Sequence, residues 1–70
     1  MSQKLILKKE YITLGQLLKA VGIAYDGVEA KMIIKDGACK VNDEEETRRG
    51  RKLYDGDIVS VREEKILITK

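Results

Sequence analysis

Four cations surround one glycine in the run Arg48-Arg49-Gly50-Arg51-Lys52, and this cluster is the part of the sequence best suited to chemistry. Arginine guanidinium groups match phosphate oxygens in two-point contacts, and lysine adds a compact positive charge. Glycine accepts a positive φ without steric cost, so we expect the backbone to turn at Gly50 and to present the flanking side chains together. The cluster therefore predicts a binding surface for a polyanion.

A plainer interpretation of the same cluster is a solvated loop. An acidic stretch over residues 43–46 is separated from the cations by Thr47 alone. Its glutamates, Glu44, Glu45 and Glu46, would neutralise much of the positive charge. The stretch lacks the alternating ligands and the glycine of a calcium-binding loop, so we expect no metal there. The binding surface and the neutralised loop stay open as alternatives at this point.

Composition narrows the classes of function. The chain has 70 residues, of which 43% are hydrophobic and 37% charged, and its net charge is +2. These values fit one globular domain near the lower size limit for a self-sufficient core, with little room for the deep cleft that most enzymes need. Because the net charge is small, any affinity for nucleic acid must come from where the charges lie.

Residue types that carry most catalytic and metal chemistry are scarce. The sequence has no histidine, and Cys39 is its one cysteine. It therefore lacks the commonest general base, an internal disulfide and a cysteine-type metal site. No nucleophile and base can be paired, so we predict no enzymatic activity, no metal and no other cofactor. Apolar runs are too short for a membrane span and no leader region is visible, so we expect a cytoplasmic protein without a membrane partner. We also expect a monomer.

Two helices are predicted before residue 38. Thr13 can cap the first helix, Gln16 completes a capping box, and a leucine-rich face repeats at helical spacing as far as Gly22. Asp26 can cap the second helix, which we expect to end at Gly37. The short loop between them predicts that the two helices pack against each other. The lysines on their outer faces are Lys19, Lys31 and Lys35.

The rest of the chain is predicted to be β-structure. A short edge strand is expected over residues 4–9, and several short strands follow residue 38, with Cys39 pointing inward. Turn signals at Asn42-Asp43 and over residues 54–57 separate these strands, and residues 62–65 form a hairpin connection. The pattern predicts an α+β fold, in which a packed helix pair covers one face of a small, mostly antiparallel sheet.

An ordered set of short motifs runs through about residues 10–62. They are residues 12–19, Gly22, Ala30-Lys31, Ile33-Ile34, Gly37, Val41-Asn42 and Gly56-Asp57. In this order and spacing the set resembles the S-four (S4) RNA-binding domain, which is named after a ribosomal protein of the small subunit. More narrowly, the chain resembles small stand-alone bacterial proteins of the YaaA type. These proteins share the opening over residues 13–16 and the run from Arg48 to Tyr54.

The resemblance implies a helix-turn-helix-like pair on a small sheet, the alpha-L motif, within a single domain over residues 1–70. It also implies a non-enzymatic protein that binds structured RNA, either ribosomal or transfer RNA, or the ribosome itself. Contact positions of the family fall on the starts of both helices and on Lys31. We predict that these positions and the cationic run converge on one exposed surface. The predicted RNA-binding residues are Thr13, Gln16, Lys19, Lys31, Lys35, Arg48, Arg49, Arg51 and Lys52.

The chain departs from the family pattern at the start of each helix. The family usually has arginine, leucine and aspartate where this chain has Thr13-Leu14-Gly15, and a serine-arginine pair where it has Asp26-Gly27. The missing arginines motivate an alternative hypothesis, a protein-binding adaptor that keeps the fold and has lost much of the RNA surface. Replacing Arg48, Arg49 and Arg51 with serine would separate the two hypotheses. An RNA-binding protein would lose co-sedimentation with ribosomes, and an adaptor would retain it.

Overall fold

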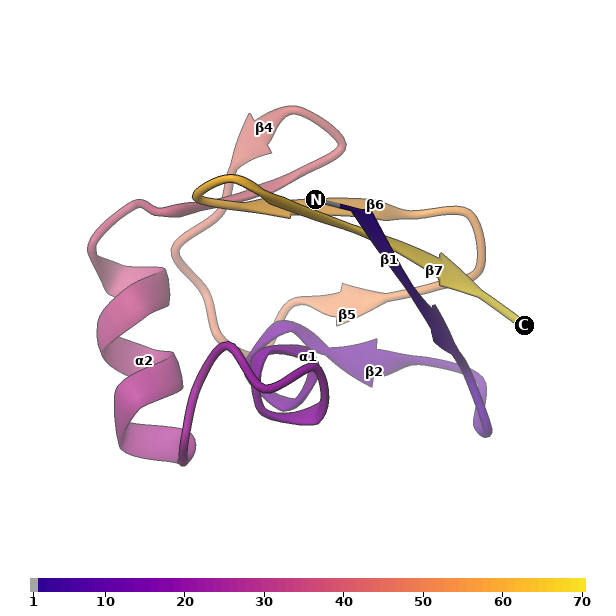
Figure 1. The fold of residues 1–70 in the computed structure, drawn as a ribbon, viewed down its shortest axis with the longest axis horizontal. Helices are drawn as coiled ribbons and strands as arrows, with labels where there is room; N and C mark the ends of the chain where they lie inside the picture. Colours follow the sequence, from indigo (N-terminus) through magenta and orange to yellow (C-terminus); the bar gives the residue numbers. More distant parts are fainter. Residues whose placement is uncertain (1) are drawn as a thin grey trace.

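The computed structural model describes residues 2–70 and arranges them as two helices and seven short strands. Figure 1 shows both helices and the β2–β5 pair on one side of a sheet formed by the other strands. The predicted α+β fold with a helix pair on a small sheet is therefore confirmed. In chain order the elements are β1 Ser2–Ile6, β2 Ile12–Thr13, α1 Leu14–Ala20, α2 Gly27–Lys35, β3 Cys39–Val41, β4 Glu44–Glu45, β5 Lys52–Leu53, β6 Ile58–Val61 and β7 Glu64–Thr69.

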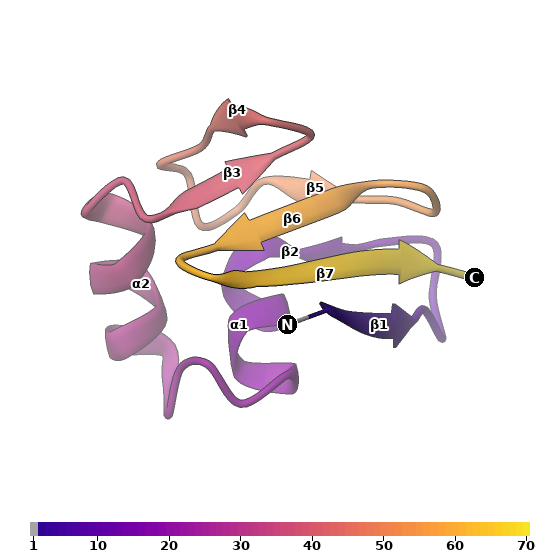
Figure 2. The same ribbon diagram turned by 45° about the horizontal axis from the view of Figure 1, so that its top comes forward.

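The main sheet has five strands in the order β1-β7-β6-β3-β4, and its β7–β6, β6–β3 and β3–β4 pairs are antiparallel (Figure 2). Strand β1 runs parallel to β7 at one edge, so the sheet is mixed but mostly antiparallel, as predicted. The edge strand expected over residues 4–9 instead spans Ser2–Ile6. Residues 8–10 are charged and exposed, and the chain bends there toward β2 because no alternating apolar face holds it on the sheet.

Helix α1 begins with the predicted capping box. The Thr13 hydroxyl oxygen accepts a hydrogen bond from the Gln16 N–H at 3.3 Å, and the Gln16 side-chain oxygen accepts one from the Thr13 N–H at 3.2 Å. These bonds satisfy donors that the helix itself cannot pair. Gly22, just after the helix, has a φ of +81°, the left-handed conformation expected of a glycine at a helix end.

Helix α2 is capped by Asp26, whose carboxylate accepts a hydrogen bond from the Glu29 N–H at 2.9 Å. Its buried face consists of Ala30, Ile33 and Ile34, which pack into the same core as the leucines of α1. Gly37 has a φ of +81° and ends the helix as predicted. The two helices contact each other directly, so the packing expected from their short connection is confirmed.

The core lies between the helix pair and the inner face of the sheet. Its fully buried side chains are Leu14, Leu17, Leu18, Ile34, Cys39, Val41, Leu53, Val59, Val61, Ile66 and Ile68. No helix within residues 2–70 is long and apolar enough to cross a membrane.

Cys39 is buried in this core, as predicted, and burial raises the pKa of its thiol above the ordinary value of 9.0 to about 11. Because the thiolate is the reactive form, we expect alkylation by iodoacetamide at neutral pH to be slower in the native protein than in urea, by roughly 100-fold or more. Labelling rates with and without urea check this. Equally fast labelling in both conditions would contradict it.

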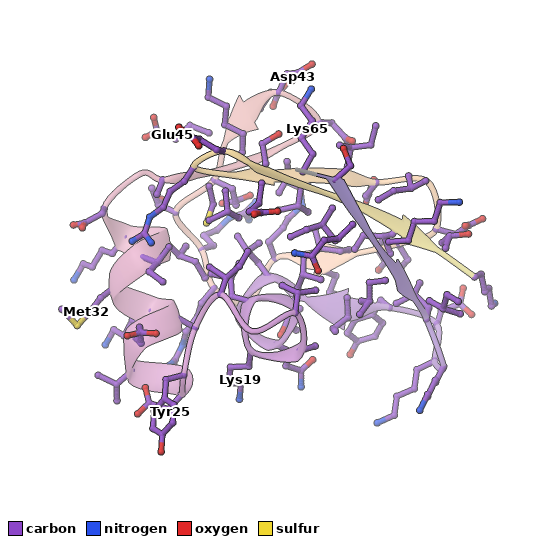
Figure 3. All side chains as sticks on the ribbon, viewed as in Figure 1. Lys19, Tyr25, Met32, Asp43, Glu45 and Lys65 are labelled. Carbon is purple, nitrogen blue, oxygen red and sulfur yellow. The ribbon has the colours of Figure 1, made fainter. Side chains whose placement is uncertain are left out.

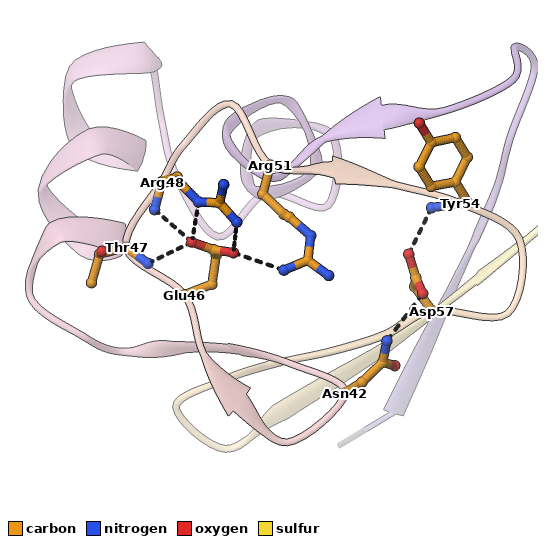
Figure 4. A network of polar contacts seen from close by, with 7 residues as sticks. All are labelled: Asn42, Glu46, Thr47, Arg48, Arg51, Tyr54 and Asp57. Atoms are coloured by element: carbon orange, nitrogen blue, oxygen red, sulfur yellow. Dashed lines mark hydrogen bonds and ion pairs between the residues drawn. The ribbon is translucent and has the colours of Figure 1, made fainter.

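The turn after β3 is tied to the turn before β6. Asn42 and Asp43 have φ values of +52° and +70°, as a two-residue hairpin loop requires. The Asn42 side chain accepts a hydrogen bond from the Ile58 N–H at 2.9 Å and donates one to Asp57 at 3.0 Å. Asp57 also accepts a hydrogen bond from the Tyr54 N–H (Figure 4). These hydrogen bonds connect the turn that precedes the cationic segment with the turn that follows it.

Candidate nucleic-acid interface

Residues 46–51 form the segment between β4 and β5, and this segment is docked on the start of α1. The Arg51 and Arg49 carbonyl oxygens accept hydrogen bonds from the N–H groups of Leu14 and Gly15, each at 2.9 Å. Such donors in the first turn have no partner within a helix. A Cβ added at Gly15 would meet the Arg49 carbonyl oxygen at 3.4 Å, so a glycine here suits the close approach. These contacts fix the cationic run beside the helix pair.

The predicted turn at Gly50 is present, but its predicted backbone conformation is wrong. The Arg51 N–H donates a hydrogen bond to the Arg48 carbonyl oxygen at 3.2 Å, which closes the turn. The glycines with positive φ among residues 2–70 are Gly22, Gly37 and Gly56, and Gly50 is not one of them. The turn is therefore closed by a backbone bond in a conformation that does not depend on glycine.

Glu46 lies beneath the run and is the one charged side chain buried among the described residues, at 6% exposure. The Arg48 guanidinium donates two hydrogen bonds of 3.0 Å to the Glu46 carboxylate, and the Arg51 guanidinium donates a third of 2.8 Å (Figure 4). The backbone N–H groups of Thr47 and Arg48 add two more at 3.1 Å. The arginine hydrogen bonds lower the pKa of the Glu46 carboxyl from 4.5 to about 2.

This pKa shift predicts a loss of stability in acid. The folded state holds the Glu46 carboxylate ionised, so its contribution is fully present above about pH 4.5 and is lost as the pH falls toward 2. Urea unfolding measured at several pH values from 7 to 2.5 checks this, with Glu46→Gln as the comparison. The variant should lack this part of the acid dependence. The same acid dependence in both proteins would show that Glu46 is not responsible.

The four cations of the run have different surroundings. Arg48 and Arg51 form ion pairs with Glu46, so for these two residues the interpretation as a loop with neutralised charge is correct. Arg48 is nevertheless 72% exposed, and part of its guanidinium faces solvent. Arg49 has no carboxylate partner anywhere in residues 2–70. The Lys52 ammonium lies 4.9 Å from the centre of the Tyr11 ring, in a cation–π contact.

Arg49 faces a shallow hollow of about 190 Å³, here named the helix-pair hollow, between the starts of the two helices. Two of its lining residues are cationic, Lys19 and Arg49, and none is acidic. The helix-pair hollow thus brings together residues from α1, α2 and the docked segment. The lining residues are Thr13, Gly15, Gln16, Lys19, Gly27, Ala30, Arg49 and Gly50.

A second hollow adjoins the first, and Gly50 lines both. This loop hollow is lined by three cations and an aromatic ring, namely Arg48, Arg51, Lys52 and Tyr54. The Tyr54 side chain is 45% exposed and its ring lies 5.9 Å from that of Tyr11. Cations beside an accessible aromatic ring suit phosphates and unpaired bases.

Lys31 and Lys35 line neither hollow. Lys31 follows Gly27 by four residues, so it lies one turn further along the flank of α2 that borders the helix-pair hollow. Lys35 lies one turn beyond, and both side chains are exposed. The predicted residues therefore fall into three groups. The helix-pair hollow contains Thr13, Gln16, Lys19 and Arg49, the adjoining loop hollow contains Arg48, Arg51 and Lys52, and Lys31 and Lys35 lie outside both.

Sequence reasoning missed Glu46 as an organiser of this surface. Three adjacent glutamates looked equivalent, yet Glu44 and Glu45 are exposed and only Glu46 turns inward to the arginines. Tyr11 was also missed as the partner of Lys52. Within residues 2–70, no group of three or more histidine, cysteine, aspartate or glutamate residues is arranged to hold a metal ion.

The architecture is that of a small α+β module whose cationic segment is docked on a helix pair. The sequence profile of the S4 domain family matches residues 5–69, and the chain belongs to this family. A Bacillus subtilis (strain 168) protein named "Probable ribosome maturation protein RlbA" is 43% identical over 61 residues, which cover 87% of this chain and 86% of that protein. The resemblance inferred from the short motifs is confirmed.

Proposed function

We propose that this protein is a non-enzymatic RNA-binding protein that docks on structured ribosomal RNA during ribosome maturation. Membership of the S4 domain family and the name of the Bacillus relative support the proposal. The observation that carries it is the helix-pair hollow, where Lys19 and Arg49 meet without an acidic neighbour in the lining. Two such cations on one concave surface suit a phosphate backbone.

The capping residues of α1 add hydrogen-bond donors to this hollow. Thr13 and Gln16 use their side-chain oxygens as acceptors inside the capping box. The Thr13 hydroxyl hydrogen and the Gln16 amide NH₂ have no acceptor within residues 2–70 and stay available. Both groups can donate to a phosphate oxygen or a ribose 2′-hydroxyl. The hollow therefore offers donors and cations, the combination that the sugar-phosphate backbone of RNA requires.

The loop hollow supplies a second contact region. Glu46 holds Arg48 and Arg51 in fixed positions, so less side-chain freedom is lost when their exposed edges meet a phosphate. Lys52 adds a cation, and the exposed Tyr54 ring can stack on an unpaired base. Lys31 and Lys35 extend the contact along α2. Double-stranded RNA hides its base edges in a deep groove, so we expect shape and backbone contacts to dominate.

Binding is expected to fall steeply with salt. If roughly four to six phosphates are neutralised, raising the salt from about 50 to 200 mM should weaken binding roughly 10²- to 10³-fold. Fluorescence anisotropy with labelled ribosomal RNA fragments measures this directly, and transfer RNA is the comparison. Absence of binding at low salt, or affinity that does not change with salt, would contradict the proposal. Tighter binding to transfer RNA would mean that transfer RNA, not ribosomal RNA, is the target.

In this role the protein would act in the cytoplasm, where ribosomes mature, and as a monomer. It needs no catalytic group, because RNA is held by charge and shape alone. The alternative of an adaptor without RNA affinity predicts no binding in the same experiment.

A further inference from the structure

The outer side of α2 carries an exposed apolar ridge. Tyr25, Val28 and Met32 are 91%, 69% and 63% exposed, and they are three of the four most exposed large apolar side chains in residues 2–70. Val28 and Met32 are four residues apart and lie on one side of α2, and Tyr25 lies in the loop just before the Asp26 cap. Figure 3 shows Tyr25 projecting beyond the first turn of α2 and Met32 projecting from the side of the helix. Contiguous exposed apolar side chains are a feature of protein interaction sites.

The ridge borders a hollow that is predominantly acidic. Its charged lining residues are three carboxylates, Asp26, Glu29 and Asp36, and one guanidinium, Arg62. Val28 and Met32 of the ridge line the same hollow. This acidic hollow contrasts with the positive net charge of the chain and with the two cationic hollows.

The ridge separates two flanks of α2 with opposite charge. Lys31 and Lys35 occupy the flank that borders the helix-pair hollow, whereas Glu29 and Asp36 line the acidic hollow on the other flank. RNA phosphates would be repelled by these carboxylates, so the acidic hollow is unsuited to RNA. A ligand here must supply positive charge together with apolar side chains.

We propose that the ridge and the acidic hollow together bind a basic amphipathic segment of another protein. Apolar side chains of the partner would pack on Val28 and Met32, and its lysines or arginines would face the carboxylates. Methionine is unbranched and adapts to different partners, and tyrosine is enriched at protein interfaces. No residue lines both the acidic hollow and the helix-pair hollow, so the two proposed binding surfaces use different side chains. The proposal does not depend on the RNA-binding role.

Two of the carboxylates also support α2. The Asp26 carboxylate accepts a hydrogen bond from the Glu29 N–H, and the Glu29 carboxylate accepts one from the Tyr25 N–H at 2.7 Å. Each keeps further oxygen lone pairs for a ligand, but replacing either would disturb the helix start. Asp36 makes no side-chain hydrogen bond or ion pair within residues 2–70. Its substitution therefore tests the charge of the hollow without loss of a side-chain hydrogen bond.

The test uses a short helical peptide of leucine and lysine, with a matched peptide in which glutamate replaces lysine. The wild-type protein should bind the basic peptide and not the acidic one. The double variant Val28→Ser/Met32→Ser should weaken binding of the basic peptide at least tenfold, and Asp36→Lys should weaken it severalfold. Ile6→Ser is the control, because Ile6 on β1 is also 69% exposed. Its binding should equal that of the wild type.

Melting temperatures verify that these surface variants stay folded. RNA affinity of the double variant should also be unchanged. Equal binding of both peptides, or equal loss in the Ile6→Ser control, would overturn the proposal. So would a wild-type dimer that the double variant converts to a monomer, because the ridge would then serve self-association.

Discussion

The double variant Lys19→Glu/Arg49→Glu is expected to weaken binding to ribosomal RNA fragments by roughly 10²-fold or more at moderate salt, with little change in stability. Both cations line the helix-pair hollow, and each replacement turns an attraction for phosphate into a repulsion. Neither side chain has an ion-pair partner within residues 2–70, and Arg49 holds Gly15 through its backbone carbonyl. Anisotropy titrations measure the affinity, and thermal unfolding measures the stability.

A matched control makes the same change of net charge on the other side of the molecule. Lys4 and Lys65 are exposed on β1 and β7 of the sheet, and Figure 3 shows Lys65 projecting from the side opposite Lys19. Lys4→Glu/Lys65→Glu should weaken RNA binding far less than the hollow variant. If both double variants lost affinity equally, total charge rather than the hollow would determine binding, and the proposed site would be wrong.

This pair of variants is cleaner than replacing all three arginines of the run. Arg48 and Arg51 hold the buried Glu46 carboxylate, so their removal would leave that charge unpaired and would disturb the docked segment. Loss of ribosome binding would then not distinguish a lost contact from a damaged loop. Arg49 avoids the problem because its side chain has no such structural contact.

Replacing Glu46 with alanine is expected to cause the largest loss of stability of any change in the docked segment. The Glu46 carboxylate accepts five hydrogen bonds, three from guanidinium groups and two from backbone N–H groups. A hydrogen bond to a charged group contributes about 1.5–3 kcal/mol, and the bonds here are not additive, so we expect a loss of about 2–4 kcal/mol. Urea unfolding at pH 7 measures it.

Glu44→Ala is the control for this substitution, because Glu44 is exposed and makes no ion pair within residues 2–70. Its unfolding free energy should lie within about 0.5 kcal/mol of the wild type. RNA binding gives a second readout. If Glu46 orients the arginines, Glu46→Ala should weaken binding although it removes a negative charge. If Glu46→Ala bound RNA more strongly and kept its stability, Glu46 would instead compete with RNA for Arg48 and Arg51.

Much of the fold could be predicted because its signals are local. The capping box of Thr13 and Gln16, the cap of Asp26 and the glycines that follow both helices are set by neighbours along the chain. The parallel pairing of β1 with β7 could not be predicted in the same way. It joins the two ends of the described chain, and its register depends on which apolar side chains reach the common core.

The candidate site was predictable in its residues but not in their arrangement. The arginine and lysine residues identified the run. Which of its cations are paired and which are free depends on contacts with other segments of the chain. Arg49 is oriented by the bond from Gly15 to its carbonyl oxygen, and Arg48 and Arg51 are held by whichever glutamate turns inward. Three adjacent glutamates gave no local reason to choose Glu46. The positive φ expected at Gly50 was wrong because a backbone hydrogen bond closes that turn without it.

The most direct test is ultraviolet crosslinking in cells, followed by sequencing of the attached RNA, for the wild type and for Lys19→Glu/Arg49→Glu. We predict that ribosomal RNA is strongly enriched with the wild-type protein and that the enrichment disappears in the double variant at equal protein abundance. Absence of ribosomal RNA from the wild-type crosslinks, or an unchanged crosslinking pattern in the double variant, would contradict the account.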